Sequence, residues 1–136
     1  MAGMVRIEER LPTPEEYREL RAAVGWKCPE APDCARALRG SIAGVCAFDE
    51  SALVGMARLV GDGAFYWYIV DVVVGPDHQG TGIGKSLVQA LERLAAHGNV
   101  AGTVNLVASP DVVAFYERLG YELTGSALLA KRVDAV

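Results

Sequence analysis

The chain has 136 residues, of which 51% are hydrophobic and 22% are charged, and its formal net charge is −4. This length and composition predict a single domain over residues 1–136 with a substantial core, and they exclude a disordered chain. The negative charge and the lack of a Lys- or Arg-rich run argue against nucleic acid as a partner.

The first forty residues are expected to form one strand and two helices. Apolar and charged residues alternate from Val5 to Arg10, which is typical of a strand. The segment Thr13–Glu16 fits a capping box with proline at the first helical position, and Gly25 is well placed to end the helix that follows. A shorter helix is expected within Asp33 to Arg39.

An antiparallel meander is expected next. The apolar runs Ile42–Phe48 and Leu53–Val60 are separated by a short polar turn and therefore predict a hairpin. Ala64–Val74 is long, aromatic and β-branched, and it predicts a third strand of the meander. Pro76 and Asp77 then end that strand.

A strand–helix–strand unit follows the meander. An apolar stripe at helical spacing predicts a helix from Gly82 to about Ala96, with a stop at Gly98. Val104–Ala108 is predicted to be a short buried strand. Because a crossover helix connects it to the preceding strand, these two strands should be parallel.

The remaining residues are expected to complete a mixed sheet. Ser109 and Pro110 should begin a final helix that closes at Gly120, and Leu123–Val133 should supply one or two last strands. The expected fold is therefore α/β (α+β), with a mixed, mostly antiparallel central sheet of six or seven strands and helices on both faces.

The cysteines and the chain start indicate the compartment. Cys28, Cys34 and Cys46 cannot all pair internally and match no zinc spacing, so we predict reduced thiols in a cytoplasmic protein, a catalytic thiol being the alternative. Met1–Arg6 lacks the apolar region of a signal peptide, and no apolar window approaches the length of a membrane span. Neither a metal site nor a membrane partner is expected.

The segment Gln79–Lys85, Gln-Gly-Thr-Gly-Ile-Gly-Lys, is the most informative about function. A strand, a glycine loop and a helix start in this order predict a phosphate cradle, because glycine leaves the backbone N–H groups accessible to an anion. A P-loop is excluded, since three residues instead of four separate Gly80 from Gly84. A dinucleotide fingerprint fails because Lys85 stands where a third glycine is required. An unrelated nucleotide-binding α/β protein remains an alternative.

Gln79-x-x-Gly82-x-Gly84 resembles the pyrophosphate-binding motif of the GNAT (N-acetyltransferase) superfamily. Downstream, Ala114–Tyr121 is similar to the last helix and following turn of that family, and the two signatures occur in the family's order. The resemblance implies the GNAT fold with a splayed pair of parallel strands, acetyl-CoA as cosubstrate without a metal, and frequently a homodimer.

The resemblance also implies the residues that bind acetyl-CoA. The pantetheine arm would pair with the main chain of the strand before the loop, and the pyrophosphate would lie against the loop itself. Ser109 stands where many members carry an Asn that contacts the cofactor. The implied cofactor-binding residues are Val72, Val73, Val74, Gln79, Gly80, Thr81, Gly82, Ile83, Gly84, Lys85 and Ser109.

The implied reaction moves an acetyl group to a primary amine, of a small molecule or a protein, by direct attack on the thioester. Tyr116 matches the family tyrosine that acts as general acid, and its phenol is protonated at neutral pH. Asp71 is a candidate base or substrate anchor, with a structural hydrogen-bonding role as the alternative. Trp26, which follows the first helix, and one face of Tyr66–Tyr68 would line the acceptor pocket. A non-catalytic acyl-CoA-binding or regulatory module is the alternative function.

Overall fold

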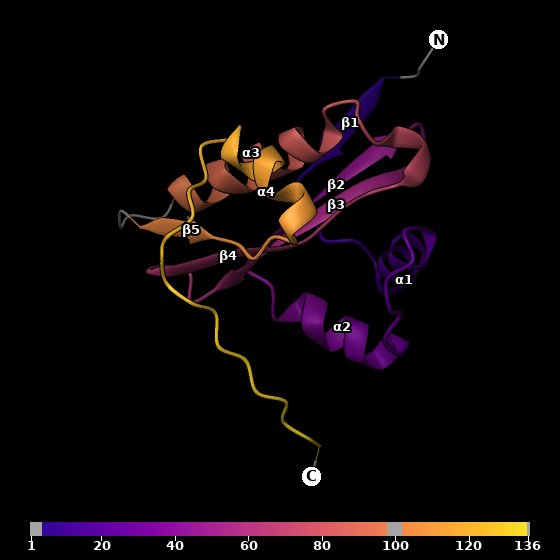
Figure 1. The fold of residues 1–136 in the computed structure, drawn as a ribbon. Helices are drawn as coiled ribbons and strands as arrows, with labels where there is room; N and C mark the ends of the chain where they lie inside the picture. The colour runs from indigo at the N-terminus through magenta and orange to yellow at the C-terminus, as the bar shows by residue number, and fades with distance from the viewer. Residues whose placement is uncertain (1–3, 98–101, 136) are drawn as a thin grey trace.

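A mixed sheet with helices on both faces forms the centre of the molecule, as Figure 1 shows. The computed structural model of the protein describes residues 4–97 and 102–135. The elements are β1 (Val5–Glu8), α1 (Pro14–Ala23), α2 (Ala31–Arg39), β2 (Ala43–Asp49), β3 (Ala52–Gly61), β4 (Tyr66–Val74), a 3-10 turn (Pro76–His78), α3 (Ile83–Ala96), β5 (Thr103–Asn105), a second 3-10 turn (Pro110–Val112) and α4 (Val113–Glu117).

The strands lie in the order β1-β2-β3-β4-β5. The first four are antiparallel to their neighbours, and β5 pairs in parallel with β4. The predicted meander and the predicted parallel pair are therefore confirmed. The parallel pair follows from chain connectivity, because α3 carries the chain back across the sheet between the two strands.

α3 covers one face of the sheet. Its buried side chains Ile83, Leu87, Leu91 and Ala95 recur at helical spacing and pack against the strands in the larger core cluster. The predicted apolar stripe is thus the buried side of the helix. Gly98, the predicted helix stop, lies outside the described residues.

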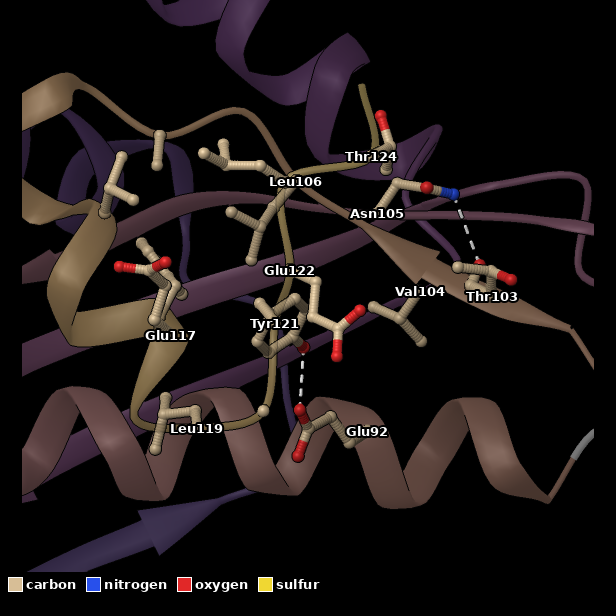
Figure 2. A pocket seen from close by; sticks show the side chains of 15 residues that line it. Glu92, Thr103, Val104, Asn105, Leu106, Glu117, Leu119, Tyr121, Glu122 and Thr124 are labelled. Atoms are coloured by element: carbon tan, nitrogen blue, oxygen red, sulfur yellow. Dashed lines mark hydrogen bonds between the residues drawn. The ribbon is translucent and has the colours of Figure 1, made fainter. Parts of the chain in front are cut away.

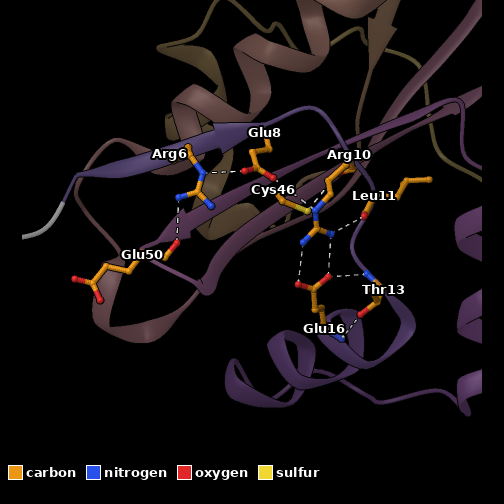
Figure 3. A network of polar contacts seen from close by, with 8 residues as sticks. All are labelled: Arg6, Glu8, Arg10, Leu11, Thr13, Glu16, Cys46 and Glu50. Carbon is orange, nitrogen blue, oxygen red and sulfur yellow. Dashed lines mark hydrogen bonds and ion pairs between the residues drawn. The ribbon is translucent and has the colours of Figure 1, made fainter.

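α1 and α2 cover the opposite face. Their buried residues form a smaller cluster with two strand residues, listed here: Tyr17, Leu20, Cys34, Leu38, Met56 and Val73. The predicted capping box positions α1, since the Glu16 N–H donates to Thr13 Oγ1 at 3.1 Å and the Thr13 N–H donates to Glu16 Oε1 at 2.8 Å. Figure 3 shows that Arg10 adds two further donors to the same Glu16 carboxylate.

Several predicted elements differ from the structure. The sheet has five strands, and the prediction of six or seven is wrong, because Leu123–Val133 is extended without any strand pairing in the described residues. β5 is shorter than the predicted Val104–Ala108, because its neighbour β4 diverges from it. The last helix is also shorter: a 3-10 turn precedes α4.

No helix in residues 4–97 or 102–135 is long and apolar enough to cross a membrane.

Candidate functional site

β4 and β5 separate after a short paired segment. β5 pairs with Tyr66–Tyr68 only, and among the described residues no strand pairs with β4 on that side from Ile69 to Val74. Along the opposite edge of β4, Asp71 and Val72 together lie opposite Ala57 of β3, which is a bulge. Because a bulge bends and twists its strand, β4 turns away from β5 and leaves an open main-chain edge. The expected parallel pair is therefore present, and its early end after Tyr68 agrees with the splay that the resemblance implies.

The three valines at this edge point alternately into the two cores. Val73 is buried in the cluster beneath α1 and α2, while Val72 and Val74 pack against the cluster beneath α3. Their side chains therefore stabilise the sheet. Main-chain groups of successive residues point to opposite edges of a strand, so those of Val73 face β3, while those of Val72 and Val74 face the opening. Contact of this main chain with a ligand stays a prediction.

The glycine loop follows directly from this edge. Gly80 and Gly82 have left-handed φ values of 78° and 89°, and a Cβ built on either would meet no heavy atom within 4 Å. Glycine is favoured at both positions because other residues rarely adopt this conformation. The space in front of the loop is thus open to a ligand that approaches the backbone.

α3 begins at the end of the loop without a side-chain cap. Ser86 is the first residue whose N–H bonds back, to Gly82 O at 3.1 Å, and no acceptor is found for the N–H groups of residues 83–85 within the described chain. These groups and the helix dipole favour an anion at this point. Lys85 is exposed beside them, whereas Ile83 is buried in the core.

The polar side chains of the loop hold its own backbone. Gln79 Nε2 donates to Val74 O at 3.1 Å, and Thr81 Oγ1 donates to His78 O at 2.6 Å. His78 Nε2 lies 3.1 Å from Asp49 Oδ2, which ties the loop to the β2–β3 turn. Main-chain N–H groups and Lys85 are therefore the donors left for an anion.

Tyr116 lies on α4, next to this helix start. A Cβ on Gly84 would come within 3.3 Å of Phe115 Cζ, so α4 contacts the first turn of α3. The Tyr116 ring packs edge-on against Phe115 and Tyr121, with centroid distances of 4.9 and 5.9 Å. Burial raises the pKa of Tyr116 above its ordinary value of 10, so the phenol keeps its proton at neutral pH.

Ser109 precedes the turn that leads into α4. Its carbonyl accepts from the Val112 N–H at 3.0 Å, but its hydroxyl makes no capping bond and is exposed. The predicted side-chain cap is therefore not formed, and the hydroxyl is available to other groups.

Asp71 lies at the bulge of β4 with a left-handed φ of 54°. Its carboxylate accepts from Tyr17 Oη at 2.7 Å, Arg58 Nε at 2.7 Å and Arg21 Nη1 at 3.0 Å. Burial, and then the bond to Asp71, raise the pKa of the Tyr17 phenol. This arrangement matches the structural role weighed for Asp71, and the sequence carried no signal for its three partners, which come from α1 and β3.

The aromatic residues expected around the acceptor divide between the faces of β4. Trp67 is buried, while Tyr66 and Tyr68 are exposed on the opposite side, as strand alternation requires. Trp26 is also exposed, and its ring lies 5.3 Å from the Arg21 guanidinium carbon.

A cavity of about 640 Å³, lined in part by Tyr116, lies between α3, β5, α4 and residues 121–124, as Figure 2 shows. Tyr121 Oη donates to Glu92 Oε2 at 2.7 Å across it, and burial followed by this bond raises the pKa of Tyr121. Neither residue was expected to line a cavity: the sequence placed Glu92 in the helix from Gly82 to about Ala96 and Tyr121 in the turn after the last helix.

Within the described residues, no three His, Cys, Asp or Glu side chains are grouped so that they would hold a metal ion.

Comparison with known proteins agrees with this geometry. Residues 4–121 match the sequence model of the acetyltransferase (GNAT) family. The chain is 45% identical over 73 residues to GCN5-related N-acetyltransferase 2, chloroplastic, of Arabidopsis thaliana. The aligned segment covers 54% of this chain and 28% of that protein. It is 36% identical over 110 residues to the uncharacterized N-acetyltransferase ycf52 of Pyropia yezoensis, covering 78% and 63% of the two chains.

Among solved structures, the fold is similar to that of SA2161, a probable acetyltransferase of unknown function from meticillin-resistant Staphylococcus aureus. The TM-score is 0.85 at 24% identity, over 97% of this chain and 100% of that one. The chain spans less than two thirds of the length of either curated relative.

Proposed function

The chain belongs to the acetyltransferase (GNAT) family, and we propose that it is an acetyl-CoA-dependent N-acetyltransferase acting on a primary amine. One observation carries the proposal. The open main-chain edge of β4 runs directly into a glycine loop and an uncapped helix start, so one continuous surface offers backbone groups to both an extended arm and a diphosphate.

Acetyl-CoA fits the donor groups of this surface. The main-chain N–H groups of residues 80–85 and the Lys85 ammonium would hold its diphosphate, and the main chain of Val72 would pair with its pantetheine arm, whereas the main chain of Val73 faces β3. The open space beside Gly80 and Gly82 is what such close backbone approach requires. Val74 O already accepts from Gln79, so we assign it to the loop and not to the ligand.

The donor supplies an activated acetyl thioester. The amine nitrogen forms a bond to the carbonyl carbon as the carbon–sulfur bond breaks, and the Tyr116 phenol gives its proton to the leaving sulfur. The amine loses a proton to water or to a base. Burial supports the acid role, because it keeps the Tyr116 phenol protonated over the pH range in which amines begin to lose their own protons.

For the acceptor, we propose an amine that binds near the exposed aromatic residues Trp26, Tyr66 and Tyr68. A cationic amine suits both aromatic rings and the net charge of −4. A role of Asp71 as base or anchor is the alternative, because its three hydrogen bonds favour a structural role. If Asp71 is structural, no side chain is assigned as base, and this favours the non-catalytic acyl-CoA-binding module as the second candidate.

Two measurements distinguish these functions. Calorimetry with acetyl-CoA, CoA, ATP and NAD tests the binding surface, and thiol release across a panel of aromatic amines, polyamines and peptide amines tests turnover. We expect micromolar binding of acetyl-CoA, weaker binding of ATP and NAD, and thiol release with at least one amine. Binding without turnover on any amine would favour the module, and tighter binding of ATP or NAD would contradict both.

A further inference from the structure

The carboxylate of Asp71 lies between two arginines and can neutralise only one of them. It accepts from Arg58 Nε at 2.7 Å and from Arg21 Nη1 at 3.0 Å, and the phenol of Tyr17 adds a neutral donor. The side chains of Arg21, Arg58 and Asp71 are only 16, 14 and 12% exposed. Within the described residues no second carboxylate pairs with either guanidinium, so this largely buried cluster carries one net positive charge.

Arg21 is held in a fixed position with one nitrogen left over. Its Nε donates to Lys27 O at 2.7 Å, and its guanidinium carbon lies 5.4 Å from the ring centroid of Tyr17 and 5.3 Å from that of Trp26. Its Nη2 has no acceptor in residues 4–97 or 102–135. Every buried side-chain nitrogen or oxygen in this part of the chain has a hydrogen-bond partner, so the Nη2 of Arg21 is open to solvent. A rigidly held cation therefore offers a free donor beside Trp26.

The cluster lies where the acetyl end of the donor would be. With the diphosphate at the glycine loop, the pantetheine arm runs back along β4 to Val72, and Asp71 is the next residue in that direction. Trp67 packs in the core cluster beneath α3, so the exposed Tyr68 points to the opposite face, which α1 covers. Tyr68 and the free donor of Arg21 therefore belong to the same face of the sheet as the proposed acceptor.

We propose that the acceptor is an amine that also carries an acid group, carboxylate or phosphate, and that this acid group binds Arg21 Nη2 beside Trp26. The inference rests on the proposed function and names the chemical class of its acceptor. The acid group supplies the negative charge that the cluster lacks, because the cluster is locally positive although the net charge of the chain is −4. A charge-assisted hydrogen bond is strong in a partly buried site, and an amine without the acid group leaves it unmade.

Thiol release from acetyl-CoA measures this preference. The panel consists of glycine, alanine, phenylalanine, tryptophan and lysine, each beside its carboxamide, and of phosphoethanolamine beside ethanolamine. We expect kcat/KM of the best acid-bearing amine to exceed that of its counterpart about tenfold or more, which is typical of a hydrogen bond to a charged group. Preference for an amino acid identifies the anion as a carboxylate, and preference for phosphoethanolamine identifies it as a phosphate. Equal or better use of the counterparts would overturn the proposal.

Variants of Arg21 connect the preference to this guanidinium. We expect Arg21→Met to raise KM of the best acid-bearing amine about tenfold or more, while KM of acetyl-CoA and of the counterpart amine changes less than about twofold. Arg21→Lys should recover part of the loss because it keeps the charge. Arg18→Met is the matched control and should leave all KM values unchanged, since Arg18 lies on the same helix and donates to Pro29 O at 2.8 Å. An equal rise of KM with both amines would show that Arg21 only maintains the fold.

Product binding separates failure of this inference from failure of the proposed function. The indole N–H signal of Trp26 is followed by NMR while the N-acetyl forms of the panel are added to the protein with CoA. We expect the acid-bearing products to shift this signal, and Arg21→Met to abolish the shift. Acid-dependent binding without thiol release from any amine would support the acid site and contradict the proposed function. Binding that does not depend on the acid group would overturn the inference, whatever the turnover.

Discussion

The phenol of Tyr116 combines two properties that a general acid needs. It is half-buried against Phe115 and Tyr121, and burial raises its pKa, so it keeps its proton well above neutral pH. We expect Tyr116→Phe to lower kcat at least tenfold while the Kd of acetyl-CoA changes less than twofold, since the ring and its packing remain. Single-turnover kinetics and calorimetry measure the two quantities, and an unchanged kcat would remove Tyr116 from the mechanism.

Asp71 holds two guanidinium groups at a bulge, and its side chain is only 12% exposed. Asp71→Asn leaves Arg21 and Arg58 without their counter-charge, so we expect a loss of roughly 2–4 kcal/mol in the free energy of unfolding. Urea denaturation measures this loss.

Arg58→Met separates the structural role of Asp71 from a catalytic one. If Asp71 is structural, both variants lose stability and keep most of their kcat at low temperature. If Asp71 is the base, Asp71→Asn alone loses at least a hundredfold in kcat, and its pH–rate profile loses the acidic limb. The second result would contradict the structural assignment.

At single residues, the glycine conformations could be predicted from the sequence, but the left-handed φ of Asp71 could not. The glycine motif follows from residue type and spacing, and Gly80 and Gly82 do adopt φ values that favour glycine. An Asp at such a φ has no sequence signature, because it is held by Tyr17, Arg21 and Arg58 from distant segments. The phosphate loop could thus be located from sequence, whereas the network beneath it could not.

Gly82 ends the glycine loop with a left-handed φ, directly before α3. Gly82→Ala forces an L side chain into a left-handed φ, at a cost of about 1–2 kcal/mol, and places a methyl group in the open space before the backbone. We expect at least tenfold weaker binding of acetyl-CoA by calorimetry. Gly40→Ala is the control, because Gly40, the residue after α2, has a φ of −79° and its Cβ would make only ordinary contacts.

α1 is held by a capping box that depends on an ionised carboxylate. The side-chain hydrogen bonds from Arg10 are the main reason why the pKa of Glu16 lies below its ordinary value of 4.5. This stabilisation is therefore complete above pH 4.5 and is lost as the pH falls through the lower folded-state pKa. We expect Glu16→Gln to destabilise the protein at pH 7 but less at pH 3, and Thr13→Ala to cost about 1 kcal/mol at either pH. Urea unfolding at both pH values measures this, and equal effects of Glu16→Gln would contradict it.

The helices and the meander could be predicted because each depends on local chemistry. Thr13 and Glu16 cap α1, and the stripe of α3 is buried as its spacing indicates. The C-terminal segment could not be placed, because a strand requires an edge to pair with and the apolar residues of Leu123–Val133 do not indicate which edge that is.

Binding of acetyl-CoA should stabilise the folded protein and raise its Tm. A ligand that binds only the folded state stabilises it by about 2.7 kcal/mol at one hundred times its Kd. For a domain of 136 residues this corresponds to a rise in Tm of about 10 °C. We expect acetyl-CoA to raise the Tm by this order in differential scanning fluorimetry, and ATP or NAD at equal concentration to raise it by less than a third as much. Gly82→Ala should lose at least about half of the rise while keeping a cooperative transition, because tenfold weaker binding leaves about 1.4 of the 2.7 kcal/mol. A larger rise with NAD, or an equal rise in the variant, would mean that the ligand stabilises the domain from another surface.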